Sequence, residues 1–174
     1  MGLKSKLFKF SVIFICIYSI ATIFFIPRNM VYVKMISLSQ NIKDYPELKS
    51  LALEIVKPCQ DYDRDLKYHC MYRMVADFVE RNITYVPDSF LEEVLMLNND
   101  PLYTLRYGGD CENKAILAID LLKQLGFKNL YFVFQDDPDP FKTDHMCYMV
   151  YDMGRFVTYN CDPTKPISQV MQVV

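Results

Sequence analysis

The stretch that decides the fold is Gly108-Gly109-Asp110-Cys111-Glu112, which leads into an apolar segment closed by Gly126. The segment is rich in alanine, leucine and isoleucine, which suit a buried helix, and the closing glycine is typical of a helix C-cap. Asp110 can cap the N-terminus with its side chain, and the two preceding glycines let the backbone turn sharply. The stretch therefore predicts a helix with Cys111 in its first turn.

A cysteine in that position is a candidate nucleophile. The thiolate is the reactive form, and the ordinary thiol pKa of about 8.5 falls at a helix N-terminus or beside a protonated histidine. The free N–H groups of the first turn also favour an anion. Taken alone, a cysteine in a helix is more often a small buried apolar residue, so the prediction for Cys111 depends on its partners.

His145 is the candidate general base, and Asp162 is its candidate partner. Residues 146–151 and 155–161 read as two strands joined by a tight turn at Met153-Gly154. That register places His145 directly opposite Asp162 on the same sheet face, where the carboxylate can orient the imidazole. The alternatives are that Asp162 is a turn residue before a proline and that His145 is a polar group at a strand edge.

These segments resemble the transglutaminase-like superfamily, which comprises papain-related thiol enzymes and includes transglutaminase-like cysteine peptidases. The matching parts are residues 78–85, residues 104–115, His145 and residues 162–164, so that the resemblance spans roughly half the chain. It implies an α+β fold with a papain/transglutaminase-like core, in which helices pack on a small antiparallel sheet. It also implies Cys111 as nucleophile, His145 as base and Asp162 as the orienting acid.

Two features depart from the family pattern. Asn113 stands where many relatives carry an acidic residue, and the chain has no tryptophan whose indole could stabilise an oxyanion. One oxyanion donor is predicted to be the backbone N–H of Cys111. The second is expected from the segment between Tyr85 and Tyr107.

The predicted function is that of a membrane-anchored thiol hydrolase, a cysteine peptidase or amidase that works through a thioester on a protein or peptide substrate. Three alternatives stay open. One is a protein-glutamine acyltransferase that crosslinks proteins, and another is an arylamine acetyltransferase. The third is a catalytically inactive module that binds a peptide or glycan.

The N-terminus predicts a membrane anchor. Three lysines, Lys4, Lys6 and Lys9, precede the almost wholly apolar run 10–26, which is long enough, or nearly so, to cross a bilayer. We expect residues 1–29 to be a single-pass anchor with the catalytic domain outside the cytoplasm. A cleaved signal peptide is the alternative, since Ser19 and Ala21 offer small side chains at the offsets of a cleavage site, but the apolar run continues beyond them.

The remainder predicts a spacer over residues 30–43 and a catalytic domain over residues 44–174. Helices are expected at 44–56, 62–82 and 88–97, and a further strand at 130–134. His69 falls in the second of these helices, where we expect it to face solvent or a local carboxylate. The loop 135–143 is expected to border the substrate cleft.

The net charge bears on the classes of binding partner, and the cysteines bear on which disulfides can form. With 19 basic and 21 acidic residues the net charge is −2, which argues against a nucleic-acid binder. Exported domains favour disulfides, and Cys59 and Cys70 could link the first two helices. The hairpin register sets Cys147 opposite Asn160, which argues against a bridge from Cys147 to Cys161.

No cofactor is expected, although calcium remains an alternative. Asp110 and Glu112 flank the candidate nucleophile, and such acids help bind calcium in some transglutaminase-like peptidases. Two carboxylates are few for an ion that takes six to eight oxygen ligands. Helix capping explains both residues equally well, so we predict no metal ligand among the site residues.

Overall fold

The computed structural model describes residues 34–40, 42–43, 45–89, 99–137, 145–152 and 154–174. The chain divides into two units, Met1–Ile36 and Ser37–Val174, and of the first only residues 34–36 are described. The predicted anchor over residues 1–29 lies outside these ranges. Within the ranges, no helix is both long enough and apolar enough to span a bilayer.

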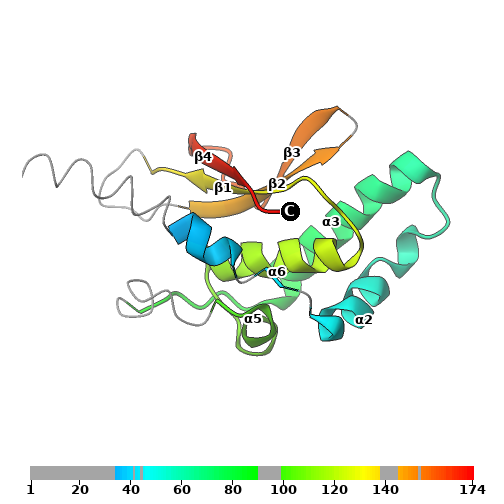
Figure 1. The fold of residues 1–174 in the computed structure, drawn as a ribbon, viewed down its shortest axis with the longest axis horizontal. Helices are drawn as coiled ribbons and strands as arrows, with labels where there is room; N and C mark the ends of the chain where they lie inside the picture. The colour runs from blue at the N-terminus through cyan, green and yellow to red at the C-terminus, as the bar shows by residue number, and fades with distance from the viewer. Residues whose placement is uncertain (1–33, 41, 44, 90–98, 138–144, 153) are drawn as a thin grey trace, which may run out of the picture. The chain divides into compact units, whose positions relative to one another are not determined.

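The second unit is an α+β fold in which helices pack on one four-stranded antiparallel sheet (Figure 1). The helices are α2 (Pro46–Ile55), the short 3₁₀ helix η1 (Lys57–Cys59), α3 (Arg64–Asn82), α5 (Pro101–Tyr107) and α6 (Cys111–Gln124). The strands are β1 (Leu130–Gln135), β2 (His145–Asp152), β3 (Arg155–Tyr159) and β4 (Ile167–Gln172), in the sheet order β3-β2-β1-β4.

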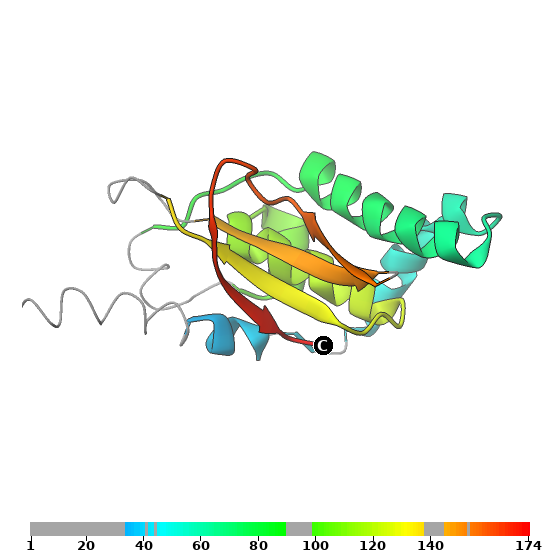
Figure 2. The same cartoon turned by 90° about the horizontal axis from the view of Figure 1, so that it is seen from above.

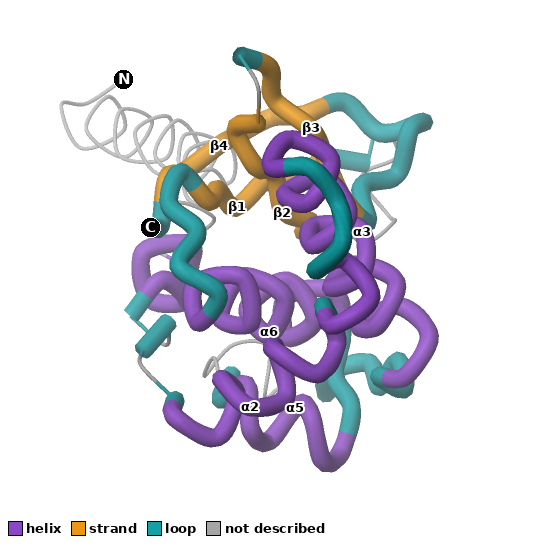
Figure 3. The backbone as a smooth tube through the Cα atoms, turned by 90° about the vertical axis from the view of Figure 1, so that its right-hand side faces the viewer, coloured by secondary structure: helices purple, strands orange, loops and turns teal. Residues whose placement is uncertain are grey.

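Helix α6 is the centre of this unit. It packs against β2 on one side and against α2, α3 and α5 on the others. Figure 2 shows the sheet lying over α6, and Figure 3 shows α2 and α5 on its far side. A helix enclosed in this way is apolar around most of its circumference. The side chains from Ala115 to Leu122 are accordingly all buried, as the sequence predicts.

The hairpin register is confirmed, but the pairing is shorter than predicted. Asp152 lies opposite Arg155, and the ladder continues to Tyr148 opposite Tyr159. There β3 ends, because Asn160 adopts a left-handed conformation with φ of 58° and turns the chain out of the strand. The ladder therefore stops before His145 and Asp162.

The helices expected at 44–56 and 62–82 are confirmed as α2 and α3, each beginning two residues later than predicted. The strand expected at 130–134 is confirmed as β1. The helix expected at 88–97 falls almost wholly outside the described ranges, and so does most of the loop 135–143. The sequence analysis missed α5 and β4. Asp100 caps α5 and a proline begins it, which is a recognisable start signal.

Two disulfides fasten the fold. The bridge between Cys59 and Cys70 joins η1 to α3, with a Cα–Cα distance of 5.7 Å, as anticipated for this pair. The second joins Cys147 to Cys161 with a Cα–Cα distance of 5.1 Å, and the prediction against it is wrong. The left-handed turn at Asn160 moves Cys161 away from its extended-strand position and within reach of Cys147.

Replacing Leu117 by alanine should test the central place of α6. Leu117 is fully buried, so the cavity should lower the free energy of unfolding by about 2–5 kcal/mol. Leu53 on α2 is 50% exposed, and Leu53→Ala should change it by no more than about 0.5 kcal/mol. Urea denaturation of both variants measures the difference, and equal losses would contradict the layered arrangement.

Candidate active site

Cys111 is the first residue of α6, and the structure confirms the predicted helix start. The Asp110 side chain accepts hydrogen bonds from the backbone N–H groups of Glu112 and Asn113, at 2.9 and 3.1 Å. Asn113 Oδ1 accepts in return from the Asp110 N–H at 3.0 Å, which completes a capping box. An amide thus performs at this position the capping that an acid would perform. The Cys111 thiol is in no disulfide and is partly exposed.

The two glycines before Asp110 allow two close approaches, that of Gly108 to the Thr84 backbone and that of Gly109 to the Asn113 side chain. Gly108 has φ of 86°, and a Cβ there would lie 2.4 Å from the Thr84 carbonyl oxygen. Gly109 donates to that same oxygen at 3.1 Å, and its own oxygen accepts from the Val86 N–H at 3.1 Å. This bridge holds Tyr85 beside the Cys111 loop.

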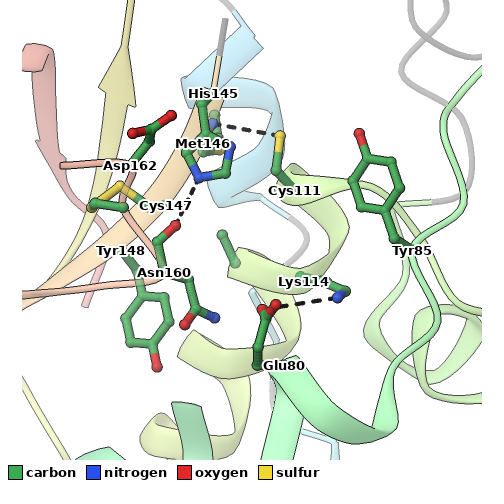
Figure 4. A pocket seen from close by; sticks show the side chains of 12 residues that line it. Glu80, Tyr85, Cys111, Lys114, His145, Met146, Cys147, Tyr148, Asn160 and Asp162 are labelled. Atoms are coloured by element: carbon green, nitrogen blue, oxygen red, sulfur yellow. Dashed lines mark hydrogen bonds and ion pairs between the residues drawn. A yellow bond between two sulfur atoms is a disulfide. The ribbon is translucent and has the colours of Figure 1, made fainter. Parts of the chain in front are cut away.

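His145 begins β2 and faces Cys111. Its Nε2 lies 2.7 Å from the backbone oxygen of Asn160, and Figure 4 shows the ring between that carbonyl and the Cys111 sulfur. A carbonyl oxygen can only accept, so Nε2 carries the ring proton and Nδ1 of the neutral ring is left as the acceptor. The Met146 N–H also donates to the Cys111 sulfur, at 3.5 Å.

Asp162 lies near this histidine, but its carboxylate accepts hydrogen bonds from Thr164. Its Oδ1 accepts from the Thr164 hydroxyl at 2.6 Å and from the Thr164 N–H at 2.8 Å. These bonds, with smaller contributions from Lys165 and His145, hold the pKa of the Asp162 carboxyl below its ordinary value of 3.8. The carboxylate is therefore charged at neutral pH.

Gln135 fastens the segment that carries Asn160 and Asp162, and sequence reasoning missed it. Gln135 is buried at the end of β1, directly opposite His145. Its amide oxygen accepts from the Asp162 N–H, and its amide nitrogen donates to the carbonyls of Asp162 and Lys165, all at 2.8 Å. A polar residue closing an otherwise apolar strand was the available signal.

The three predicted residues line one cavity of about 480 Å³. Tyr85, Lys114 and Glu80 also line it. His69 is not among these lining residues. It lies in a separate hollow along α3, and among the described residues its Nδ1 is buried with no hydrogen-bond partner, so this nitrogen does not face solvent or a carboxylate as expected. In the described part of the chain, no group of three histidine, cysteine or acidic side chains could hold a metal ion.

Comparisons of the chain with protein-family models, with curated proteins and with solved structures found no match. The assignment of its chemistry therefore depends on the geometry of Cys111, His145 and the segment 160–165.

The hydrogen bonds from Thr164 to Asp162 lead to a prediction about the pKa of the Asp162 carboxyl. A lowered folded-state pKa stabilises the fold fully above the unfolded value of 3.8, and this contribution is lost as the pH falls through the folded pKa. Thr164→Val removes the hydroxyl donor, so the pKa of Asp162 should rise toward 3.8. Carboxyl ¹³C titration by NMR measures the shift, and an unchanged pKa in the variant would show that the hydroxyl bond is absent in solution.

Proposed function

We propose that this protein is a thiol hydrolase of amide bonds, a cysteine peptidase or amidase with a papain/transglutaminase-like core. The observation that carries the proposal is the placement of His145 between the Asn160 carbonyl and the sulfur of a helix-start cysteine. A nucleophile, a base beside it and a third group that orients the base form the arrangement that covalent catalysis needs.

The reaction follows from the ring tautomer. His145 Nδ1 takes the proton from the Cys111 thiol, and the thiolate then attacks the carbonyl carbon of the bound amide. As the tetrahedral intermediate collapses, the imidazolium gives its proton to the departing amine, and the acyl group remains on sulfur as a thioester. Water, activated by the same nitrogen, then attacks the thioester and releases the acid, which restores the thiol.

Two groups would assist His145, one by orienting the ring and the other by stabilising its protonated form. The Asn160 carbonyl fixes the tautomer through its 2.7 Å bond to Nε2. Asp162 contributes charge rather than a direct bond, since its ionised carboxylate stabilises the imidazolium that forms during attack. This division differs from the prediction that the carboxylate itself holds the ring.

The oxyanion would have two donors. The first is the backbone N–H of Cys111, which lies in the first turn of α6, where N–H groups point out of the helix end. The second is the Tyr85 hydroxyl, at the edge of the segment where a donor is expected. Figure 4 shows Tyr85 on the side of Cys111 away from His145. Burial and the nearby Cys111 charge raise the pKa of Tyr85, so its hydroxyl stays protonated and can donate.

The two disulfides support an extracytoplasmic placement of the domain, because disulfides persist in oxidising compartments and are rare in the cytosol. Residues 1–29 would then tether the enzyme to the membrane. A peptide or protein outside the cytoplasm is the corresponding substrate.

Replacing the nucleophile or the base should abolish hydrolysis. Cys111→Ser should leave no detectable release of new amino termini from a denatured protein substrate, and His145→Gln should slow release by about 10²–10⁴-fold. His69→Gln is the matched control and should keep wild-type activity. Wild-type activity in Cys111→Ser would refute the proposal, while incorporation of an added primary amine into the substrate would identify the acyltransferase alternative.

Tyr85→Phe tests the second oxyanion donor. Loss of one donor should lower kcat by about a hundredfold with little change in KM, since the donor acts mainly on the transition state. Tyr107→Phe is the control, because Tyr107 is equally exposed and does not line the cavity. A wild-type kcat in Tyr85→Phe would remove this residue from the mechanism.

A further inference from the structure

Lys114 places a largely enclosed positive charge one helical turn beyond the nucleophile. It lies on α6, lines the same cavity as Cys111, and has a side chain only 12% exposed. In the part of the chain that the structure describes, its one acidic partner is Glu80, with Nζ and Oε2 4.0 Å apart. That separation is longer than a hydrogen bond.

The Glu80 carboxylate compensates the enclosed charge of Lys114 poorly. An enclosed cation is costly unless a close partner satisfies it, whereas an ion pair with a well-exposed acid contributes little. The Glu80 side chain is 64% exposed, so it can leave the lysine and be solvated at small cost. A better-placed anion in the cavity would therefore bind Lys114 in place of Glu80.

Other donors face the same region. Tyr148 lines the cavity and is fully buried, and its hydroxyl has no hydrogen-bond partner among the described residues. Figure 4 shows Tyr148 and the Asn160 side-chain amide on the same side of the cavity as the Lys114–Glu80 pair, with Asp162 away from them. An ammonium, an amide and a phenol together suit a ligand rich in acceptor oxygens.

We propose that Lys114 binds a carboxylate of the substrate, so that the amide attacked by Cys111 belongs to an acidic chain. This inference depends on the proposed hydrolase function and names its substrate class. Glu80 occupies the anion's place when the cavity is empty and withdraws when the substrate carboxylate binds. Lys114 is then a specificity-determining residue of the site.

The test uses two methanethiosulfonate reagents of matched size on the full chain with both disulfides intact. One carries a sulfonatoethyl group and the other a trimethylammonioethyl group. In each reaction the Cys111 thiolate attacks the reagent's sulfenyl sulfur, a mixed disulfide forms and methanesulfinate leaves. The rate at the Cys111 peptide is followed by mass spectrometry, and the anionic-to-cationic rate ratio cancels general changes in thiol reactivity.

Lys114→Met should lower this ratio by about tenfold, since a charge that lines the same cavity as Cys111 acts oppositely on the two reagents. Lys114→Arg should keep the wild-type ratio, and Glu80→Gln should raise it. Lys128→Met makes the same change in net charge at an exposed position outside the cavity and should leave the ratio unchanged. An unchanged ratio in Lys114→Met, or equal falls in Lys114→Met and Lys128→Met, would overturn the proposal.

Peptide substrates then identify the carboxylate. Peptides with glutamate or glutamine beside the amide, each with a free or amidated C-terminus, should show the highest kcat/KM where a carboxylate is present, and Lys114→Met should remove that preference. The pair that responds tells whether a side-chain or terminal carboxylate is bound. Cleavage of all four peptides at equal rates would contradict the substrate class. If no peptide is cleaved while the labelling ratios change as expected, the hydrolase function fails and the anion site stands.

Discussion

The hydrogen bond of 2.7 Å between His145 Nε2 and the Asn160 carbonyl is the interaction on which the site depends. It selects the ring tautomer and directs the other nitrogen toward Cys111. A backbone carbonyl can do this only if the chain leaves β3 at the correct point, and the left-handed turn at Asn160 provides that departure. The disulfide from Cys161 to Cys147 and the three hydrogen bonds of Gln135 then hold the segment against β1 and β2.

The nucleophile is positioned by a separate set of constraints. Asp110 and Asn113 cap the start of α6, and Gly108 allows residues 84–86 to approach closely. Because α6 is enclosed between the sheet and the other helices, its first turn has little freedom to shift. Cys111 is thus positioned by helix capping and core packing, and His145 by the sheet register and the Cys147–Cys161 disulfide. The two come together where the Met146 N–H donates to the Cys111 sulfur and at the cavity that Cys111 and His145 both line.

Local signals in the sequence were enough to predict α6, the hairpin register and the three candidate residues. Capping, turn chemistry and strand periodicity act over a few residues, and all are visible in the printed sequence. The partner of His145 was not predictable in this way. The left-handed conformation of Asn160 ends the ladder and brings Cys161 within reach of Cys147. It also sets the Asn160 carbonyl, in place of a carboxylate, against the ring of His145. Asparagine tolerates that conformation without requiring it.

The roles of Gln135 and Lys114 could not be predicted from the sequence for a second reason. Neither is part of a motif, and each gains its role from residues far along the chain: Asp162 and Lys165 for Gln135, and Glu80 for Lys114. Only tertiary packing brings these groups together. From the sequence alone, a single polar residue in an apolar strand, or a lysine one turn after a cysteine, indicates only that the side chain is buried. It does not indicate which groups the side chain contacts.

The pH dependence of Cys111 alkylation by iodoacetamide tests most directly whether Cys111 and His145 act as one thiolate–imidazolium unit. The account predicts rapid alkylation well below the ordinary thiol pKa of about 8.5, with the rate midpoint returning toward that value in His145→Gln. A wild-type midpoint near that of an ordinary thiol, or one that His145→Gln leaves unchanged, would contradict it.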